Sequence, residues 1–165
     1  MKDILIRLSA HANQVAAMLA TLDRSALAKG QLIISQSFLN QLAVILSDES
    51  LKFQNVTLND DGTVCLSVQA GKQMNLSYRM KIDTFRMADG RAEGIISYQE
   101  EHKNAGIGGA LLHMTGKSGL AVALGKYPWL RVNDQTIQLQ KNGLPSSVRI
   151  QFVSAGRGGL LFRTN

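Results

Sequence analysis

Two glycine-rich stretches contain the residue types of nucleotide-binding loops, but at the wrong spacing. Gly116, Lys117 and Ser118 offer backbone amides, an amine and a hydroxyl that could hold a triphosphate and its metal. That motif needs another glycine five residues before Gly116, and Leu111 stands there. Leu111 also replaces the third glycine of a dinucleotide fingerprint that would start at Gly106. The sequence therefore predicts no nucleotide cofactor.

Metal-binding and acid–base residues are equally scattered. The three histidines lie far apart in sequence, and none has a second histidine at the spacing of metal ligands. Cys65 is the only cysteine, which excludes an internal disulfide and a zinc site built on several thiolates. The carboxylate pair at 60–61 precedes Gly62 and is typical of a turn, and the pair at 100–101 fits a strand end. We therefore expect no metal, no catalytic residue and no enzymatic activity.

The charge of the chain indicates an anionic partner without specifying one. The formal net charge is +6 and the pI is about 9.7, which favours contact with acidic proteins, phospholipid surfaces or nucleic acids. Lysines and arginines occur singly from Lys2 to Arg163, and no basic run is interleaved with aromatic residues. A dedicated nucleic-acid-binding protein is not indicated by this distribution.

The elements that would position these residues begin with helices. Apolar residues recur every three or four positions from Leu5 to Leu22, with Leu19 on the apolar face, and predict one N-terminal helix that ends before Gly30. Residues 31–34 are rich in β-formers. Ser35 can then cap a second helix whose buried stripe contains Phe38, Leu39, Leu42, Ile45 and Leu46.

The hydrophobic period changes to two between residues 51 and 100. Short alternating runs are separated by turns that contain Asp-Gly or Ala-Gly, which predicts hairpins of neighbouring antiparallel strands. One run, from Met74 to Met87, is so long that it must bend or carry a bulge to stay on a small core. We therefore expect a strongly curved antiparallel sheet.

A glycine-rich helical pattern interrupts the strands from residue 105 to residue 125. Its glycines weaken a helix but allow close approach to other backbones, so we expect this helix in the concave face of the sheet. Further strands are predicted at 129–133, 136–140, 147–152 and 159–163. With 165 residues, the chain is expected to form a single α+β domain, residues 1–165, with an N-terminal helical part over 1–30.

One segment resembles a known family. Residues 31–42 read QLIISQSFLNQL, a strand, a serine, a short spacer, Leu-Asn and a helix. This opening is similar to that of the bacterial LmeA-like phospholipid-binding domains and their relatives in the tubular lipid-binding (TULIP) superfamily, and the element order stays similar to about residue 163. The resemblance implies a sheet wrapped around a helix, with acyl chains held in an apolar groove between them.

The expected ligand is therefore a lipid or another amphipathic molecule, bound between helix 105–125 and the concave sheet. The predicted groove residues are Ile107, Leu111, Met114, Leu120, Met74, Met80 and Met87, although apolar residues at such positions more often form ordinary core. Basic residues expected to hold an anionic headgroup are Arg79, Lys117, Lys126 and Arg131. An anionic membrane surface is a second expected partner.

A different class of function fits the same pattern. The chain could be a protein-interaction or homo-oligomeric scaffold module, with the last strand, Gly159 to Arg163, as an exposed edge for strand pairing. A hydrolase with dispersed catalytic residues is a third alternative. Because Arg7 and His11 interrupt the apolar core that a signal peptide needs, and no span of about 20 apolar residues occurs, we expect a cytoplasmic protein, peripheral to the membrane where it binds lipid.

Overall fold

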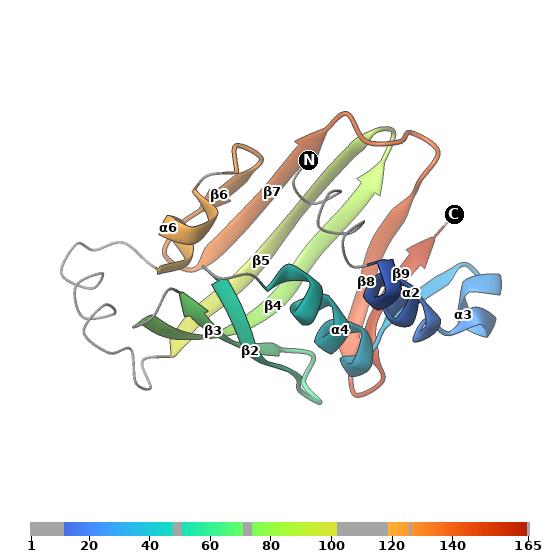
Figure 1. The fold of residues 1–165 in the computed structure, drawn as a ribbon. Helices are drawn as coiled ribbons and strands as arrows, with labels where there is room; N and C mark the ends of the chain where they lie inside the picture. The colour runs from blue at the N-terminus through green and yellow to red at the C-terminus, as the bar shows by residue number, and fades with distance from the viewer. Residues whose placement is uncertain (1–11, 48–50, 71–73, 102–118, 126, 165) are drawn as a thin grey trace.

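The computed structural model describes residues 12–47, 51–70, 74–101, 119–125 and 127–164, and within these ranges the protein is one antiparallel sheet with helices on it (Figure 1). The strands are β1 Gln31–Ile34, β2 Leu51–Leu58, β3 Val64–Ala70, β4 Met74–Ala88, β5 Arg91–Glu101, β6 Leu130–Val132, β7 Thr136–Asn142, β8 Ile150–Gly156 and β9 Gly159–Thr164. The helices are α2 Ala12–Ala20, α3 Arg24–Ala28, α4 Gln36–Leu46 and α6 Gly119–Leu124. The predicted α+β class with an antiparallel sheet is confirmed.

Strand β4 is the central strand of the sheet and pairs with three other strands. One of its edges pairs with β5 from Ser77 to Ala88, and the sheet continues through β7 to β6. The other edge pairs with β3 over residues 74–80 and with β8 only at Arg86 and Met87. The sheet therefore divides along this edge into a β3–β2 branch and a β8–β9–β1 branch.

The two branches meet again at their hairpin turns. Gly62, in the β2–β3 turn, has a φ of +80°, and a Cβ there would lie 2.5 Å from the Cβ of Ala155 in β8. Only glycine fits this contact. Beside it, Arg157 forms an ion pair with Asp60 at 3.3 Å. The turn that the sequence predicted at 60–62 thus also joins the branches.

The long strand carries the predicted irregularity. The β4–β5 register shifts between Ile82 and Thr84, so that Asp83 has no partner residue in β5, and the Asp83 carboxylate accepts a hydrogen bond from the Ser97 hydroxyl. The turn after β4 uses Asp89 and Gly90, whose φ angles of 52° and 77° suit a two-residue hairpin turn. Both the bulge and this turn were predicted from the sequence.

The bulge keeps apolar side chains on one face along the whole of β4. Leu76, Tyr78, Met80 and Ile82 occupy even positions, and the inserted residue shifts the alternation, so Phe85 continues the same face. In register with these β4 residues lie further apolar residues of six other strands. We call this side the apolar face, and it contains Leu66, Met87, Ala92, Ile96, Tyr98, Val132, Ile137, Leu139, Ile150, Phe152 and Phe162 in addition. The opposite face carries mostly polar side chains, and we call it the polar face.

The N-terminal helices differ from the prediction. The predicted single helix ends at Ala20, and Asp23 begins α3 by accepting hydrogen bonds from the backbone amides of Ser25 and Ala26 at 2.8 and 3.1 Å. The predicted burial of Leu19 was also wrong, because Met18 is the buried residue of α2 and Leu19 is 54% exposed. Val15 and Leu22 of the predicted face are half-buried, and its start at Leu5 lies outside the described residues. A short helix with its own cap replaces the last turns that the periodicity suggested.

Helix α4 begins as predicted and protects the edge of β2. The Ser35 hydroxyl accepts from the amide of Phe38 at 3.2 Å, and Ile45 is fully buried. The Gln36 side chain donates to the carbonyl of Val56 at 2.6 Å and accepts from the amide of Leu58 at 2.5 Å, as a neighbouring strand would. The first turn of α4 therefore occupies part of the free edge of β2.

Two strand predictions need correction. The strand predicted at 147–152 begins at Ile150 and ends at Gly156, because Pro145 leads into a turn before it. The last strand is not an edge, since β9 lies between β8 and β1. The sequence could not show that β1 returns to cover it. Of the helix predicted at 105–125, the structure describes residues 119–125, and Gly119–Leu124 is helical.

Candidate functional site

The apolar face is closed at one end by helix α6. Leu120 of this helix is 7% exposed and packs with buried residues of β4, β5 and β7. The rings of Tyr78 and Tyr98 meet edge to face, with centroids 6.1 Å apart. We call the group the Tyr78 cluster, and its members are Leu76, Tyr78, Tyr98, Leu120 and Ile137.

The two tyrosines of this cluster differ in their hydroxyl groups. Tyr98 donates to the backbone carbonyl of Asn133 at 2.6 Å. Tyr78 is 1% exposed, and its Oη makes no hydrogen bond of regular geometry among the described residues, although the backbone of Leu120 lies close enough to act weakly on it. Burial, reinforced by the negative charge of Glu100, raises the pKa of Tyr78 above its ordinary value. The Tyr78 hydroxyl therefore stays protonated and can donate a hydrogen bond.

The other end of the face contains three phenylalanines from β4, β8 and β9. Phe162 lies edge to face with Phe85 and with Phe152, at centroid distances of 6.0 and 5.5 Å. Phe162 is 9% exposed, whereas the other two are half-buried. The Phe85 ring lies over Gly94, where a Cβ would be 3.2 Å from Phe85 Cδ2. We call these three residues the phenylalanine cluster.

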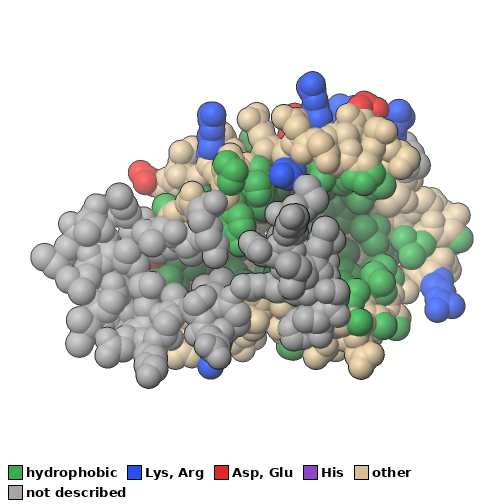
Figure 2. All heavy atoms as spheres, turned by 45° about the horizontal axis from the view of Figure 1, so that its top comes forward, with side chains coloured by type: hydrophobic (Ala, Val, Ile, Leu, Met, Phe, Trp, Pro, Cys, Tyr) green, Lys and Arg blue, Asp and Glu red, His purple; other side chains and the backbone are tan. Residues whose placement is uncertain are grey.

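Between and beside the two clusters, apolar side chains keep part of their surface exposed. These half-buried residues are Ile82, Met87, Ile96, Leu139 and Ile150, drawn from β4, β5, β7 and β8. Figure 2 shows hydrophobic side chains gathered across the middle of the molecule, with lysine and arginine side chains toward the rim. The apolar face thus carries several apolar side chains that are partly accessible.

The predicted ligand residues fall in different parts of this face. Leu120 lies inside the Tyr78 cluster, and Met80 packs against it. Met87 lies at the other end, opposite Ile150 of β8. Met74 begins β4 opposite Ala70. The remaining predicted residues, Ile107, Leu111 and Met114, lie outside the described residues.

The basic residues predicted for a headgroup are not beside the apolar face where they are described. Arg79 lies on the polar face and forms an ion pair with Glu101 at 3.3 Å. Arg131 is exposed on β6, in register with Gln138. Lys117 and Lys126 lie outside the described residues.

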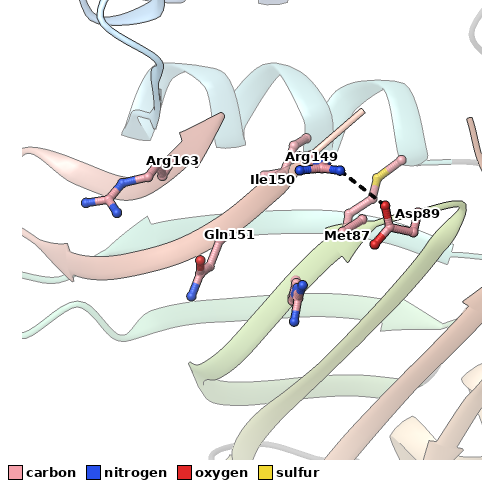
Figure 3. A pocket seen from close by; sticks show the side chains of 8 residues that line it. Met87, Asp89, Arg149, Ile150, Gln151 and Arg163 are labelled. Carbon is pink, nitrogen blue, oxygen red and sulfur yellow. Dashed lines mark hydrogen bonds and ion pairs between the residues drawn. The ribbon is translucent and has the colours of Figure 1, made fainter. Parts of the chain in front are cut away.

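A pocket that sequence reasoning missed lies where β4 meets β8 (Figure 3). It has a volume of about 210 Å³ and three arginines among its lining residues, Arg86, Arg149 and Arg163. Arg149 forms an ion pair with Asp89 at 3.4 Å. These arginines are far apart in sequence, and only the β4–β8–β9 register brings them together, so no motif could have identified them.

Neither similarity to known proteins nor a metal-binding group among the described residues indicates a function. The chain matches no family model, and no curated protein or solved structure is significantly similar to it. The described residues contain no group of three histidine, cysteine or carboxylate side chains placed to hold a metal. None of the helices in the described ranges has the length and hydropathy needed to cross a membrane. Any functional assignment must therefore be based on the apolar face and the arginine pocket.

Proposed function

We propose that this chain is a non-catalytic binding protein that holds a lipid or another amphipathic molecule with its hydrocarbon part on the apolar face. The observation that carries the proposal is the strip of half-buried apolar residues on β4, β5, β7 and β8 between the Tyr78 cluster and the phenylalanine cluster. The likeness of residues 31–42 to LmeA-like and TULIP domains supports the same class of ligand.

The hydrophobic contribution to such binding depends on the number of methylene groups that leave water. Each methylene group that moves from water onto an apolar surface contributes about 0.8 kcal/mol. A chain of eight methylenes would thus supply roughly 6 kcal/mol before the costs of ordering the ligand. Met87 suits an irregular hydrocarbon because its thioether side chain adapts to different shapes. The glycine-rich segment 105–125 is proposed as the cover of the bound chain.

An interaction or oligomeric scaffold is the second candidate, and the strand edges argue against its simplest form. The last strand is paired on both sides. In the strand order β1-β9-β8-β4-β5-β7-β6, the two outermost strands are short: β1 has four residues and β6 has three. Such short edges offer little backbone to an added strand. The longer free edge of β2 is partly occupied by Gln36 of α4, so the apolar face is the broader surface for a partner protein.

Neighbouring residues on opposite faces of β5 provide a test. Ile96 lies half-buried on the apolar face, and Ile95 is 40% exposed on the polar face. We expect Ile96→Gln to weaken the binding of a fluorescent fatty acid by about tenfold, since an apolar contact of this size contributes roughly 1.5 kcal/mol. Ile95→Gln should leave the affinity unchanged. Titration by fluorescence gives both dissociation constants.

Met87→Gln is a second variant at a position remote from the Tyr78 cluster, in case Ile96→Gln lowers the stability. It should weaken binding in the same direction while the midpoint of thermal unfolding stays close to that of the unmodified protein. Equal affinity of the Ile96, Ile95 and Met87 variants would contradict the proposal. So would the absence of fatty-acid binding by the unmodified protein, and native mass spectrometry would then show which other molecule or protein copurifies with it.

A further inference from the structure

The arginine pocket is organised by the register of three strands. Arg86 of β4 pairs with Gln151 of β8, and Gln151 pairs with Arg163 of β9. Residues opposite one another in a sheet point to the same side, so two guanidinium groups flank one amide on the polar face. In Figure 3, Gln151 extends to one side of the strands, and Met87 and Ile150 lie on the other. The pocket therefore has a row of hydrogen-bond donors along one wall.

The charges in this row are not balanced by carboxylates. Among the residues that the structure describes, neither Arg86 nor Arg163 has a carboxylate within ion-pair distance. Glu93 of β5 stands opposite Arg86 of β4, but these two described side chains form no ion pair with each other. The third arginine, Arg149, has Asp89 as its partner. Three guanidinium groups and one carboxylate leave the pocket a formal charge of +2.

We infer that this pocket binds an oxyanion of the phosphate class, with Arg86 and Arg163 as its principal ligands and the Gln151 amide between them. Strands β4 and β9 are two strand spacings apart, roughly 9–10 Å, and two arginine side chains can converge across that distance on a single tetrahedral anion. The planar guanidinium group donates two parallel hydrogen bonds to phosphate oxygens, which lysine does not.

The inference does not rest on the proposed lipid function, because a soluble phosphate ester would use the same donors. Arg86 and Arg163 lie on the polar face, so a lipid whose chain lies on the apolar face would reach them around the end of β4, where Met87 and Ile150 also line the pocket. A phosphate-bearing ligand could thus have its anion at the arginines, whether it is a phospholipid or a small soluble molecule.

Asp89 limits the affinity of the pocket. Its carboxylate lies 3.4 Å from Nη2 of Arg149 and repels an incoming anion. Asp89 also occupies the first central position of the β4–β5 turn with a φ of 52°, a conformation that asparagine tolerates as well as aspartate does. Asp89→Asn therefore removes the competing charge without disturbing the turn.

The first measurement is a titration of the full chain with inorganic phosphate at low ionic strength, followed by calorimetry or by NMR shifts of the β8 amides. Arg86→Gln combined with Arg163→Gln should weaken phosphate binding by about tenfold or more, because each arginine contributes a charge-assisted hydrogen bond. Arg131→Gln, at a site on β6 that is also exposed, should change the affinity less than twofold. Asp89→Asn should strengthen binding by about threefold.

Vesicles then distinguish the source of the phosphate. If phosphatidic acid vesicles bind the protein, phosphatidylcholine vesicles do not, and inorganic phosphate competes, the anion is a headgroup. If phosphate binds and neither vesicle does, the ligand is a soluble phosphate compound. Phosphate binding that is absent, or that is the same in the double Arg86/Arg163 variant and in Arg131→Gln, would overturn the inference. Fatty-acid binding without phosphate binding would overturn it while leaving the proposed function intact.

Discussion

The Tyr78 cluster and the phenylalanine cluster have the same kind of ring contact, but their side chains are buried to different degrees. The Tyr78 cluster and the phenylalanine cluster each contain edge-to-face pairs and each include residues of β4. In the first, Leu120 of α6 lies on the rings, and every member is buried. In the second, the three rings come only from strands, and two stay half-buried. The presence of a covering helix, and not the number of aromatic rings, distinguishes the buried cluster from the half-buried one.

The largest expected effect is the difference in stability between the two ends. Leu76→Ala, in the Tyr78 cluster, should lower the free energy of unfolding by about 3 kcal/mol, since it removes a side chain that is 5% exposed and leaves a cavity. Leu139→Ala removes the same atoms from a half-buried position in the row of Phe85 and Gly94. It should cost about half as much. Urea unfolding of both variants gives the comparison.

Equal losses for the two leucine variants would show that the phenylalanine end is as closed as the Tyr78 end. The apolar surface would then be ordinary core, and the lipid proposal would lose its main support. Unchanged m-values would confirm that both variants unfold from native states of similar compactness.

Much of the fold could be predicted because its signals are local. The Asp-Gly turns, the Ser35 cap and the need for a bulge in a strand from Met74 to Met87 each depend on a few adjacent residues. Asp23 carried the same kind of signal for α3, and a search for caps within the N-terminal helical pattern would have found it. Periodicity alone extended the helix too far and assigned Leu19 to the wrong face.

The remaining features depend on contacts between distant segments. Pairing of β1 with β9 joins residues 31–34 to residues 160–163, and no pattern within either segment specifies it. The arginine pocket likewise requires the β4–β8 and β8–β9 registers. Single exposed arginines in alternating strands are common, so their clustering becomes visible only once the strands are placed.

The hydroxyl groups of Tyr78 and Tyr98, both inside the Tyr78 cluster, provide a second comparison. Tyr78→Phe should raise the free energy of unfolding by about 1 kcal/mol, because it removes a buried polar atom that makes no hydrogen bond of regular geometry among the described residues. Tyr98→Phe is the control and should lower the free energy of unfolding, since Tyr98 donates to the Asn133 carbonyl. A loss of stability in both variants would mean that the Tyr78 hydroxyl is bonded within the chain.

The pH dependence of stability should also differ between the unmodified protein and Tyr78→Phe. Burial raises the pKa of Tyr78 in the folded state, so the unfolded chain loses this proton first, near pH 10. The effect of Tyr78 on stability is therefore constant below pH 10, and the free energy of unfolding falls as the pH rises from there toward the folded-state pKa. Thermal unfolding between pH 9 and 11 should show a steeper loss for the unmodified protein than for Tyr78→Phe.

The smallest change in stability is expected for a variant in the phenylalanine cluster. Phe85→Leu removes the edge-to-face contact with Phe162, which contributes about 0.5–1 kcal/mol beyond simple burial, and keeps an apolar side chain over Gly94. Stability should fall by no more than this amount, while fatty-acid affinity should change severalfold, because the ring borders the half-buried strip. Calorimetric unfolding and fluorescence titration of the same preparation separate the two effects. A loss of several kcal/mol with unchanged affinity would assign Phe85 to the core, which would place the boundary of the binding surface on the β5 side of this ring.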